Sequence, residues 1–383
     1  MMTPPVQPSH VTVRSVEAVK ELRDELSRLA VLPAAASGIV QHPDWLLFEV
    51  AWRGDIMAPY LVVVRDGQGK LIGYAPMLTC VHHARIHFGN RYLQVYRGYA
   101  LRLLGERVVA VPEHRSLVER LVADALLNDR QARVVRIQET ILPNALAATM
   151  ATGAQRFSAV QVNMLDQVNW SITPQASLAD YLATLGSKKR NDLSRRVRNV
   201  YKKLGEQTRL RVFETPESID EYAALMKQLY ARSWHATEQP IDWTLPARLA
   251  LFRQLAQDGR FLAHVLMQGE RPVAYVHGYR LGGRYLLDDT GYDEAFASLG
   301  AGSALVFQAV QDVIARFPGE TIDFGYGDNQ YKRVLGNRQI ACGSLYLVRG
   351  ATPLARFGLI VPLRGLYRWV HGRMRREQAA SAA

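Results

Sequence analysis

The strongest fold signal in the chain is the stretch Arg284–Arg333, RYLLDDTGYDEAFASLGAGSALVFQAVQDVIARFPGETIDFGYGDNQYKR. It predicts a strand at 284–289, a loop of small residues, a helix from about Ser303 to Phe317 and a short strand at 321–325. Apolar residues recur through the helix at the 3.6-residue period, and Pro318-Gly319 ends it. Two parallel strands joined by a helix form a βαβ unit. The glycines before its helix leave backbone N–H groups for an anionic or carbonyl ligand.

Three motifs stand in this stretch in a fixed order: Ser298-Leu299-Gly300, then Asp323-Phe324-Gly325-Tyr326-Gly327, then Tyr331-Lys332. With them the chain resembles the GNAT acyltransferase superfamily. Within it, the chain is similar to the FemAB-like branch often labelled cellulose-biosynthesis (CelD-like) acetyltransferases. The resemblance is good over residues 175–340 and looser over 40–160.

The order of predicted elements is the same in both halves of the chain: helix, hairpin, strand, helix, strand. This order and the resemblance predict an α/β protein of two tandem GNAT-like domains, each a mixed twisted sheet flanked by helices. We expect a degenerate N-terminal domain at 1–165, which builds one wall of the cleft or only stabilises the protein. A catalytic domain follows at 166–347 and a basic amphipathic tail at 348–383.

Composition narrows the class of protein. The chain has 383 residues, 48% of them hydrophobic, which is enough for ordinary globular cores. Two cysteines far apart, no signal-peptide pattern and no apolar run near 18 residues indicate a cytoplasmic protein. The net charge of +12 favours an anionic partner: nucleic acid, anionic lipid or an acidic protein. No zinc-ligand spacing, P-loop, Gly-x-Ser-x-Gly elbow or DNA-binding motif is present, so we expect neither a metal nor DNA.

The turn before the predicted helix is the expected donor site. The resemblance implies that backbone amides of Gly300, Ala301, Gly302 and Ser303 bind the pyrophosphate of coenzyme A. The usual family motif has Arg or Gln three residues before the first glycine, where this chain has Ala297. Some relatives take the acyl group from a carrier protein, or an aminoacyl group from tRNA. We therefore expect no permanently bound cofactor, and acyl-CoA or acyl-carrier protein as the donor substrate.

Direct acyl transfer to an amine needs a base for the amine proton and an acid for the departing thiolate. Because neighbours on a strand point to opposite faces, only one of Asp288 and Asp289 is expected to face a cleft, and we choose Asp289 as the base. His277 and His264 are further candidates. The resemblance favours a tyrosine as the acid, and Tyr331 is our choice.

Substrate-binding candidates come from two segments. The helix predicted at Ser187–Leu204 has an apolar stripe and eight basic residues against one acid, Asp192. Such a helix fits a phosphate on the acceptor, an acidic carrier protein or tRNA, or it is a solvated face packed through its stripe. The predicted substrate-binding residues are Tyr326, Asp328 and Lys332 in the final loop, and Lys188 and Arg190 on this helix.

Together these observations predict an N-acyltransferase that moves an acyl group from a thioester to an amine. The resemblance alone implies an acceptor on a polysaccharide or cell-envelope precursor. Two alternatives remain: an aminoacyl-tRNA-dependent transferase of the FemAB type, and a catalytically degenerate polysaccharide- or membrane-binding module. The basic, apolar tail suits peripheral contact with the anionic inner face of a membrane, or a helix packed on the domain with its arginines outward.

Overall fold

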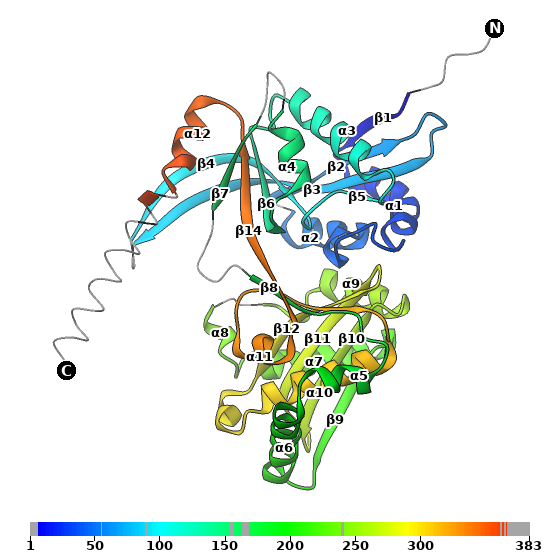
Figure 1. The fold of residues 1–383 in the computed structure, drawn as a ribbon, viewed down its shortest axis with the longest axis vertical. Coiled ribbons are helices and arrows are strands. Elements are labelled where there is room, and N and C mark those ends of the chain that lie inside the picture. Colours follow the sequence, from blue (N-terminus) through cyan, green and yellow to red (C-terminus); the bar gives the residue numbers. More distant parts are fainter. Residues whose placement is uncertain are drawn as a thin grey trace, which may run out of the picture. The chain divides into compact units, whose positions relative to one another are not determined.

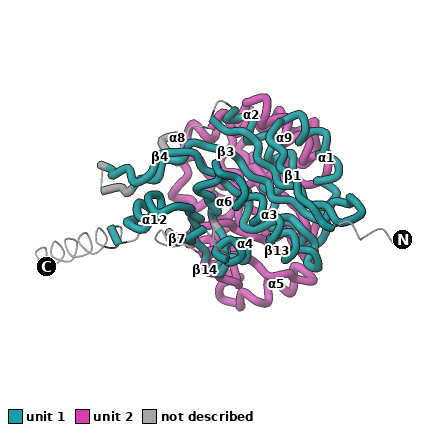
Figure 2. The backbone as a smooth tube through the Cα atoms, turned by 90° about the horizontal axis from the view of Figure 1, so that it is seen from above, with its two compact units in different colours: residues 1–167, 342–383 teal, residues 168–341 magenta. Residues whose placement is uncertain are grey.

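The chain forms two compact units (Figure 2). The computed structural model describes residues 7–54, 56–88, 91–152, 157–162, 168–238, 241–360, 362–363 and 365. Unit 1 comprises residues 1–167 and 342–383, and unit 2 comprises residues 168–341. The division falls inside the strand β14 (Arg338–Val348), so residues 342–347, which the sequence analysis places in the catalytic half, belong to unit 1.

Unit 2 is a sheet with helices on both faces (Figure 1). Its strands lie in the order β8-β13-β12-β11-β10-β9, with the start of β14 pairing β8. The strands are β8 (Val168–Ile172), β9 (Thr208–Phe213), β10 (Phe261–Gln268), β11 (Arg271–Leu281), β12 (Arg284–Tyr292) and β13 (Thr321–Tyr326). The helices are α5 (Leu178–Thr184), α6 (Ser187–Leu204), η2 (Pro216–Ser218), α7 (Ile219–Tyr230), α8 (His235–Glu238), α9 (Pro246–Gln257), η3 (Glu294–Leu299), α10 (Ala301–Arg316) and α11 (Gln330–Leu335).

The two faces of this sheet have different cores. On one face α10 and α6 pack over aliphatic residues, among them Leu266, Val276 and Leu287. On the other face α7 and α9 enclose an aromatic cluster in which the Tyr222 ring contacts Phe252 and Phe261. The hydrophobic stripe of α6 is what attaches this basic helix to the unit, because Leu193, Val200 and Leu204 are buried while its charged residues face outward.

Unit 1 repeats the order of elements. Its strands are β1 (Ser9–Val13), β2 (Met57–Arg65), β3 (Leu71–Phe88), β4 (Arg91–Leu103), β5 (Val109–Ala110), β6 (Val134–Ile141), β7 (Ser158–Val162) and the end of β14. Its helices are α1 (Val16–Ala30), η1 (Ile39–Gln41), α2 (Pro43–Arg53), α3 (Arg115–Asn128), α4 (Ala145–Met150) and α12 (Ala351–Gly358). β4 pairs β6 in parallel across α3, as β12 pairs β13 across α10. The predicted α/β class with two mixed sheets flanked by helices is confirmed.

Part of the tail lies in the described chain. α12 follows β14, and its Phe357 is fully buried in contact with the Tyr96 and Tyr346 rings. The first segment of the tail is therefore packed on unit 1. The membrane prediction rested on the basic residues from Arg349 onward. Of these, Arg349 donates to the Leu127 and Asp129 carbonyls of unit 1, and Arg364 and the arginines after it lie outside the residues whose side chains are described.

Candidate active site

The strands β12 and β13 pair over a short distance only. Their parallel ladder joins Arg284, Tyr285 and Leu286 to Thr321, Ile322 and Asp323. It ends there because Asp323 Oδ1 accepts a hydrogen bond from the Gly325 N–H at 2.8 Å, and Gly325 adopts φ +66°. Beyond this point β13 pairs with β8 and β12 pairs with β11, so the backbone edge of 287–292 that faces β13 has no strand partner among the described residues.

A β-bulge lies on this free part of β12. His277 pairs with Asp289 and Gly278 pairs with Leu287, so Asp288 is the extra residue. A bulge breaks the alternation of side chains. Asp288 Oδ2 lies 3.6 Å from His277 Nε2, and Asp289 Oδ2 accepts from Tyr275 Oη at 2.8 Å. Both carboxylates therefore lie on the α7 and α9 face. The expectation that only one of them can face that side is wrong, because it assumed a regular strand.

Asp289 is held by three groups. Besides Tyr275, its Oδ1 accepts from the Thr290 N–H at 2.8 Å and lies 3.6 Å from His235 Nε2. His235 stacks on Tyr230 at 5.5 Å between centroids. Burial, and the charge and hydrogen bond of Asp289, hold the pKa of Tyr275 well above its usual range, so Tyr275 remains a donor. The carboxylate is thus fixed in position while its side chain keeps 23% exposure.

The two candidate histidines are on opposite faces of the sheet. His277 is 2% exposed, and its Nδ1 lies 2.9 Å from Tyr222 Oη inside the aromatic cluster. It touches the site through Asp288. His264 is fully buried and contacts Asp312 of α10 at 2.8 Å, on the face away from Asp288 and Asp289. The structure does not bring His264 to the site.

Tyr331 lies in α11, directly after the loop that follows β13. Its ring meets Phe324 edge-on at 6.0 Å between centroids. Burial, and then the negative charge of Asp289, raise the pKa of its hydroxyl above the ordinary range. The charge of Asp289 therefore acts on the Tyr331 hydroxyl, although the two residues stand 42 positions apart in the sequence. The phenol stays protonated at neutral pH.

The predicted donor turn is the start of α10. The helix begins at Ala301 and not near Ser303, because Gly300 supplies the left-handed N-cap conformation at φ +69°. Asp293 anchors the preceding loop by accepting from the Ala295 N–H and pairing with Arg271. A Cβ at Gly302 would lie 2.8 Å from Tyr292 Cδ1, so this glycine permits close packing of the helix on β12.

Gly300 and Ser303 are exposed, whereas Ala301 and Gly302 are buried. No hydrogen-bond partner is found within the described chain for the backbone N–H groups of Ala301, Gly302 and Ser303. First-turn N–H groups of this kind, at the positive end of the helix dipole, favour an anion.

The remaining loop candidates hold the loop together. Lys332 is 4% exposed and donates from Nζ to the Tyr326 carbonyl at 2.8 Å. The hydroxyl oxygen of Tyr326 is buried. Asp328 accepts from Trp170 Nε1 at 3.0 Å and pairs with Arg333, whose hydrogen bond lowers the pKa of this carboxyl. Lys332 and Tyr326 thus present little of their polar ends to solvent.

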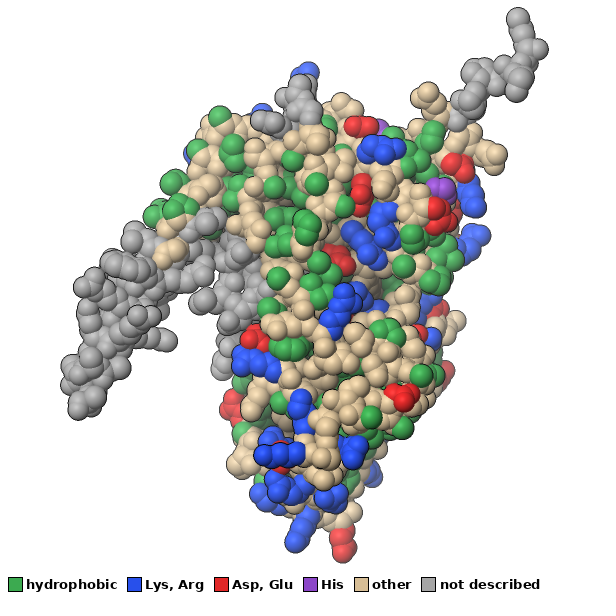
Figure 3. All heavy atoms as spheres, in the orientation of Figure 1, with side chains coloured by type: hydrophobic (Ala, Val, Ile, Leu, Met, Phe, Trp, Pro, Cys, Tyr) green, Lys and Arg blue, Asp and Glu red, His purple; other side chains and the backbone are tan. Residues whose placement is uncertain are grey.

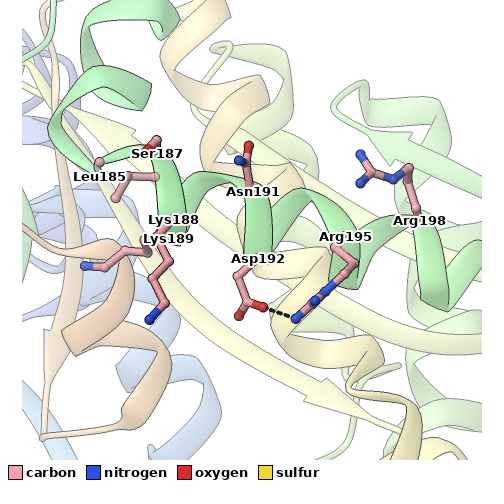
Figure 4. Close-up of a pocket in the computed structure, with 9 residues that line it drawn as sticks. Leu185, Ser187, Lys188, Lys189, Asn191, Asp192, Arg195 and Arg198 are labelled. Carbon is pink, nitrogen blue, oxygen red and sulfur yellow. Dashed lines mark hydrogen bonds and ion pairs between the residues drawn. The ribbon is translucent and has the colours of Figure 1, made fainter.

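A basic hollow of about 950 Å³ lies along the first half of α6 (Figure 4). It is lined by Leu185, Gly186, Ser187, Lys188, Lys189, Asn191, Asp192, Arg195 and Arg198. Lys189 Nζ donates to the Val334 carbonyl of α11 at 3.1 Å, so the hollow adjoins the helix that carries Tyr331. Arg190 is half-buried and does not line it. Figure 3 shows basic side chains gathered over α6.

In the part of the chain that the structure describes, both metal-ligand clusters and membrane-spanning helices are absent. No group of three His, Cys, Asp or Glu side chains in that part of the chain could hold a metal ion. None of the helices described there is long and apolar enough to cross a membrane.

Residues 187–333, which span these elements, match the family described as "Acetyltransferase (GNAT) domain". The chain contains a GNAT acyltransferase domain. The match begins with α6 and ends in α11, so the basic helix, the free edge of β12, the Gly300 turn and Tyr331 all belong to the GNAT domain.

Solved structures extend the likeness to both units. FemX has 11% sequence identity to this chain and a TM-score of 0.55, over 93% of this chain and 99% of FemX. L-PGS from Bacillus licheniformis has 15% identity and a TM-score of 0.52, over 91% of this chain and 96% of its own. At these identities the likeness concerns the fold, and it confirms the prediction of a tandem GNAT-like, FemAB-like architecture. The comparison with curated proteins found no match.

Sequence reasoning missed the residues that position Asp289. Tyr275 and His235 lie on β11 and α8, and neither stands in a recognisable motif. Of the two, only Tyr275 could have been found from the sequence. It stands two residues before His277 on the same strand, so the two side chains share a face.

Proposed function

We propose that the GNAT domain transfers an acyl group from a thioester donor to an amine, without a covalent enzyme intermediate. The observation that carries the proposal is the free edge of β12, which has the Gly300 turn at its end and Asp289 and Tyr331 within electrostatic reach of each other. A donor with amide groups in an extended arm can pair with this edge as an added strand. Its phosphate end would then meet the N–H groups at the start of α10.

The chemistry assigns one role to each side chain. Asp289 takes a proton from the attacking amine, whose nitrogen forms the new bond to the carbonyl carbon. The carbon–sulfur bond breaks, and the thiolate receives a proton from Tyr331. Backbone N–H groups at the Asp288 bulge are proposed to stabilise the negative charge on the carbonyl oxygen. His277 is proposed to orient Asp288.

Lys188 and its neighbours on α6 are proposed to bind phosphate groups of a substrate. Exposed basic residues continue to Lys202 and Lys203, which lie beyond the hollow. A row of that length suits a macromolecular polyanion better than a single nucleotide. For this reason we propose an acyl-carrier protein and an aminoacyl-tRNA as alternative donors to acyl-CoA. The acceptor is proposed to be an amine on a polysaccharide or cell-envelope precursor.

The experiment offers the purified protein acetyl-CoA, acyl-carrier protein and aminoacyl-tRNA in separate reactions, with a panel of amino sugars and amino acids. Free thiol release and product mass are measured, with Asp289→Asn as the control for uncatalysed transfer. The proposal is supported if the protein forms an amide from a thioester and the Asp289→Asn variant does not. Transfer from aminoacyl-tRNA alone would replace it with the FemAB-type reaction, and absence of transfer from all three donors would refute catalysis of this kind.

A further inference from the structure

In unit 1, β3 and β4 extend past the rest of their sheet as a two-stranded ribbon (Figure 1). After Cys80, β3 pairs with β4 alone, and β4 pairs with β6 only at Leu101–Leu103. The ribbon comprises residues 81–88 and 91–99 of the described chain. An isolated two-stranded ribbon is marginally stable in water, so at least one of its faces has to be covered.

The protein covers one face. Ala84 and Val95 of the ribbon are buried in a small core with Phe357 of α12. Tyr96 contacts Phe357 at 5.1 Å between ring centroids, and His82 Nε2 lies 3.1 Å from Tyr346 Oη. These contacts fix the ribbon to unit 1 and determine which of its faces remains open.

The open face carries apolar, aromatic and basic side chains together. Val81 is 56% exposed and Tyr92 is 52% exposed. His83 lies opposite Arg97 in the ladder, and both are exposed. The Arg85 guanidinium carbon lies 4.4 Å from the centre of the Tyr92 ring. Half-exposed Val81 and Tyr92 beside arginines form a surface that water solvates poorly and that an interface between water and hydrocarbon suits well.

The charge of this segment has one sign. No Asp or Glu occurs between Asp66 and Glu106, whereas five Lys or Arg residues do: Lys70, Arg85, Arg91, Arg97 and Arg102. Arg102 pairs with Glu49, and the arginines farther along the ribbon lie next to no acid in the sequence. The positive charge favours an anionic partner. Val81 would gain nothing from the phosphates of a nucleic acid but would gain from acyl chains.

We infer that the open face of the β3–β4 ribbon docks on an anionic lipid bilayer, with Val81 in contact with the acyl chains, Tyr92 at the level of the headgroups, and Arg85 and Arg97 on lipid phosphates. Aromatic residues favour this level of a bilayer, and each basic residue near it adds electrostatic attraction. This inference is independent of the proposed acyl transfer.

The test is flotation of the full-length protein with vesicles of phosphatidylcholine alone, and with vesicles of equal parts phosphatidylcholine and phosphatidylglycerol. We expect binding to the anionic vesicles only. The double variant Arg85→Gln/Arg97→Gln should lower the partition coefficient about 30-fold. Val81→Ser/Tyr92→Ser should lower it about tenfold, since apolar contact is lost.

Two matched controls separate the ribbon from general surface properties. Ile56→Ser removes an apolar side chain that is 63% exposed elsewhere in unit 1, and Lys202→Gln/Lys203→Gln removes two charges from α6 in unit 2. Both should bind like the unaltered protein. Each variant's melting temperature shows whether it is folded. If folded ribbon variants bind like the unaltered protein, if the controls lose as much binding, or if neutral vesicles bind equally well, the inference is overturned.

Discussion

Asp288 and Asp289 are neighbours in the chain, yet their carboxylates lie on the same face of the sheet. The bulge at Asp288 produces this arrangement, and it gives the two acids different partners. Asp289 is hydrogen-bonded to Tyr275 and to its neighbouring backbone, whereas Asp288 is 37% exposed and lies beside His277. Several hydrogen-bond donors fix the orientation of a carboxylate. A general base needs a fixed orientation toward the proton that it accepts.

Asp289→Asn should lower kcat about 100- to 1,000-fold, because the amide cannot accept the amine proton. Asp288→Asn should lower it less than tenfold. The two variants are matched in chemistry and position, and they are compared by steady-state kinetics with whichever of the three donors supports transfer. If Asp288→Asn lowers kcat more than Asp289→Asn does, the general base is Asp288 with its partner His277.

Tyr331→Phe should lower kcat about tenfold to 100-fold with little change in KM, because the hydroxyl acts on the leaving thiolate. Burial and the Asp289 charge raise the pKa of Tyr331, so the folded enzyme holds the phenol protonated below about pH 10. The ratio of wild-type to variant rates should therefore be constant from pH 7 to about 10. Tyr326→Phe is the control. A ratio that falls toward one within this range would show that the phenol ionises there.

The elements that depend on local sequence were predictable. The helix expected at 187–204 is α6, since its apolar stripe is regular and glycines flank it at Gly186 and Gly205. The helix α10 begins before the predicted Ser303, because the left-handed Gly300 is at once the C-cap of η3 and the N-cap of α10.

The site itself was only partly predictable. Asp289 was chosen from side-chain alternation along its strand and Tyr331 from the resemblance, and their roles stay predictions. In the structure the charge of Asp289 raises the pKa of Tyr331. The bulge could not be predicted, because it depends on how β12 pairs with a strand whose register the local sequence does not fix. The burial of Lys332 was not predictable either. The sequence around it indicated a charged loop residue, whereas in the structure its Nζ donates to the Tyr326 carbonyl.

Substitution of the two glycines in the turn before α10 should have different effects on stability and on donor binding. Gly300→Ala should lower the free energy of unfolding by about 1 kcal/mol, because alanine is strained at positive φ. Gly300→Asn should cost less, since asparagine tolerates this region and nothing lies within 4 Å of the added Cβ. Gly302→Ala should displace α10 from Tyr292 and weaken donor binding. Urea unfolding and donor titration measure these effects. Equal stability of the two Gly300 variants would contradict the strain argument.

Unit 1 predicts an acid-sensitive contact at Asp44. Burial opposes ionisation of this carboxyl, but hydrogen bonds from His42 and Arg23 lower its pKa to about 2. Because the folded pKa is below that of the unfolded chain, the contribution is present above about pH 4 and is lost as the pH falls toward 2. Asp44→Asn should lower the free energy of unfolding by about 1 to 2 kcal/mol at pH 7, and by less as the pH approaches 3.

Asp24 offers the control for that measurement. Its side chain is 82% exposed and lies 3.4 Å from the same Arg23. Asp24→Asn should change the stability little at any pH, since exposed ion pairs contribute weakly. Urea unfolding of unit 1 at several pH values compares the two variants. A loss at Asp44 that does not vary with pH would mean that packing, and not ionisation, is responsible.

The two ends of α6 distinguish a small donor from a macromolecular one. Lys188→Gln/Arg198→Gln changes the hollow, whereas Lys202→Gln/Lys203→Gln changes exposed charges beyond it. If the donor is acyl-CoA, only the first pair should raise the donor KM, by about tenfold, because the ligand's phosphates reach one end of the helix. If the donor is an acidic carrier protein or tRNA, both pairs should raise KM, and the effect should shrink as salt is added. If KM is unchanged in both double variants, the basic face of α6 is a solvated surface that binds no donor, and Lys188 is not a substrate-binding residue.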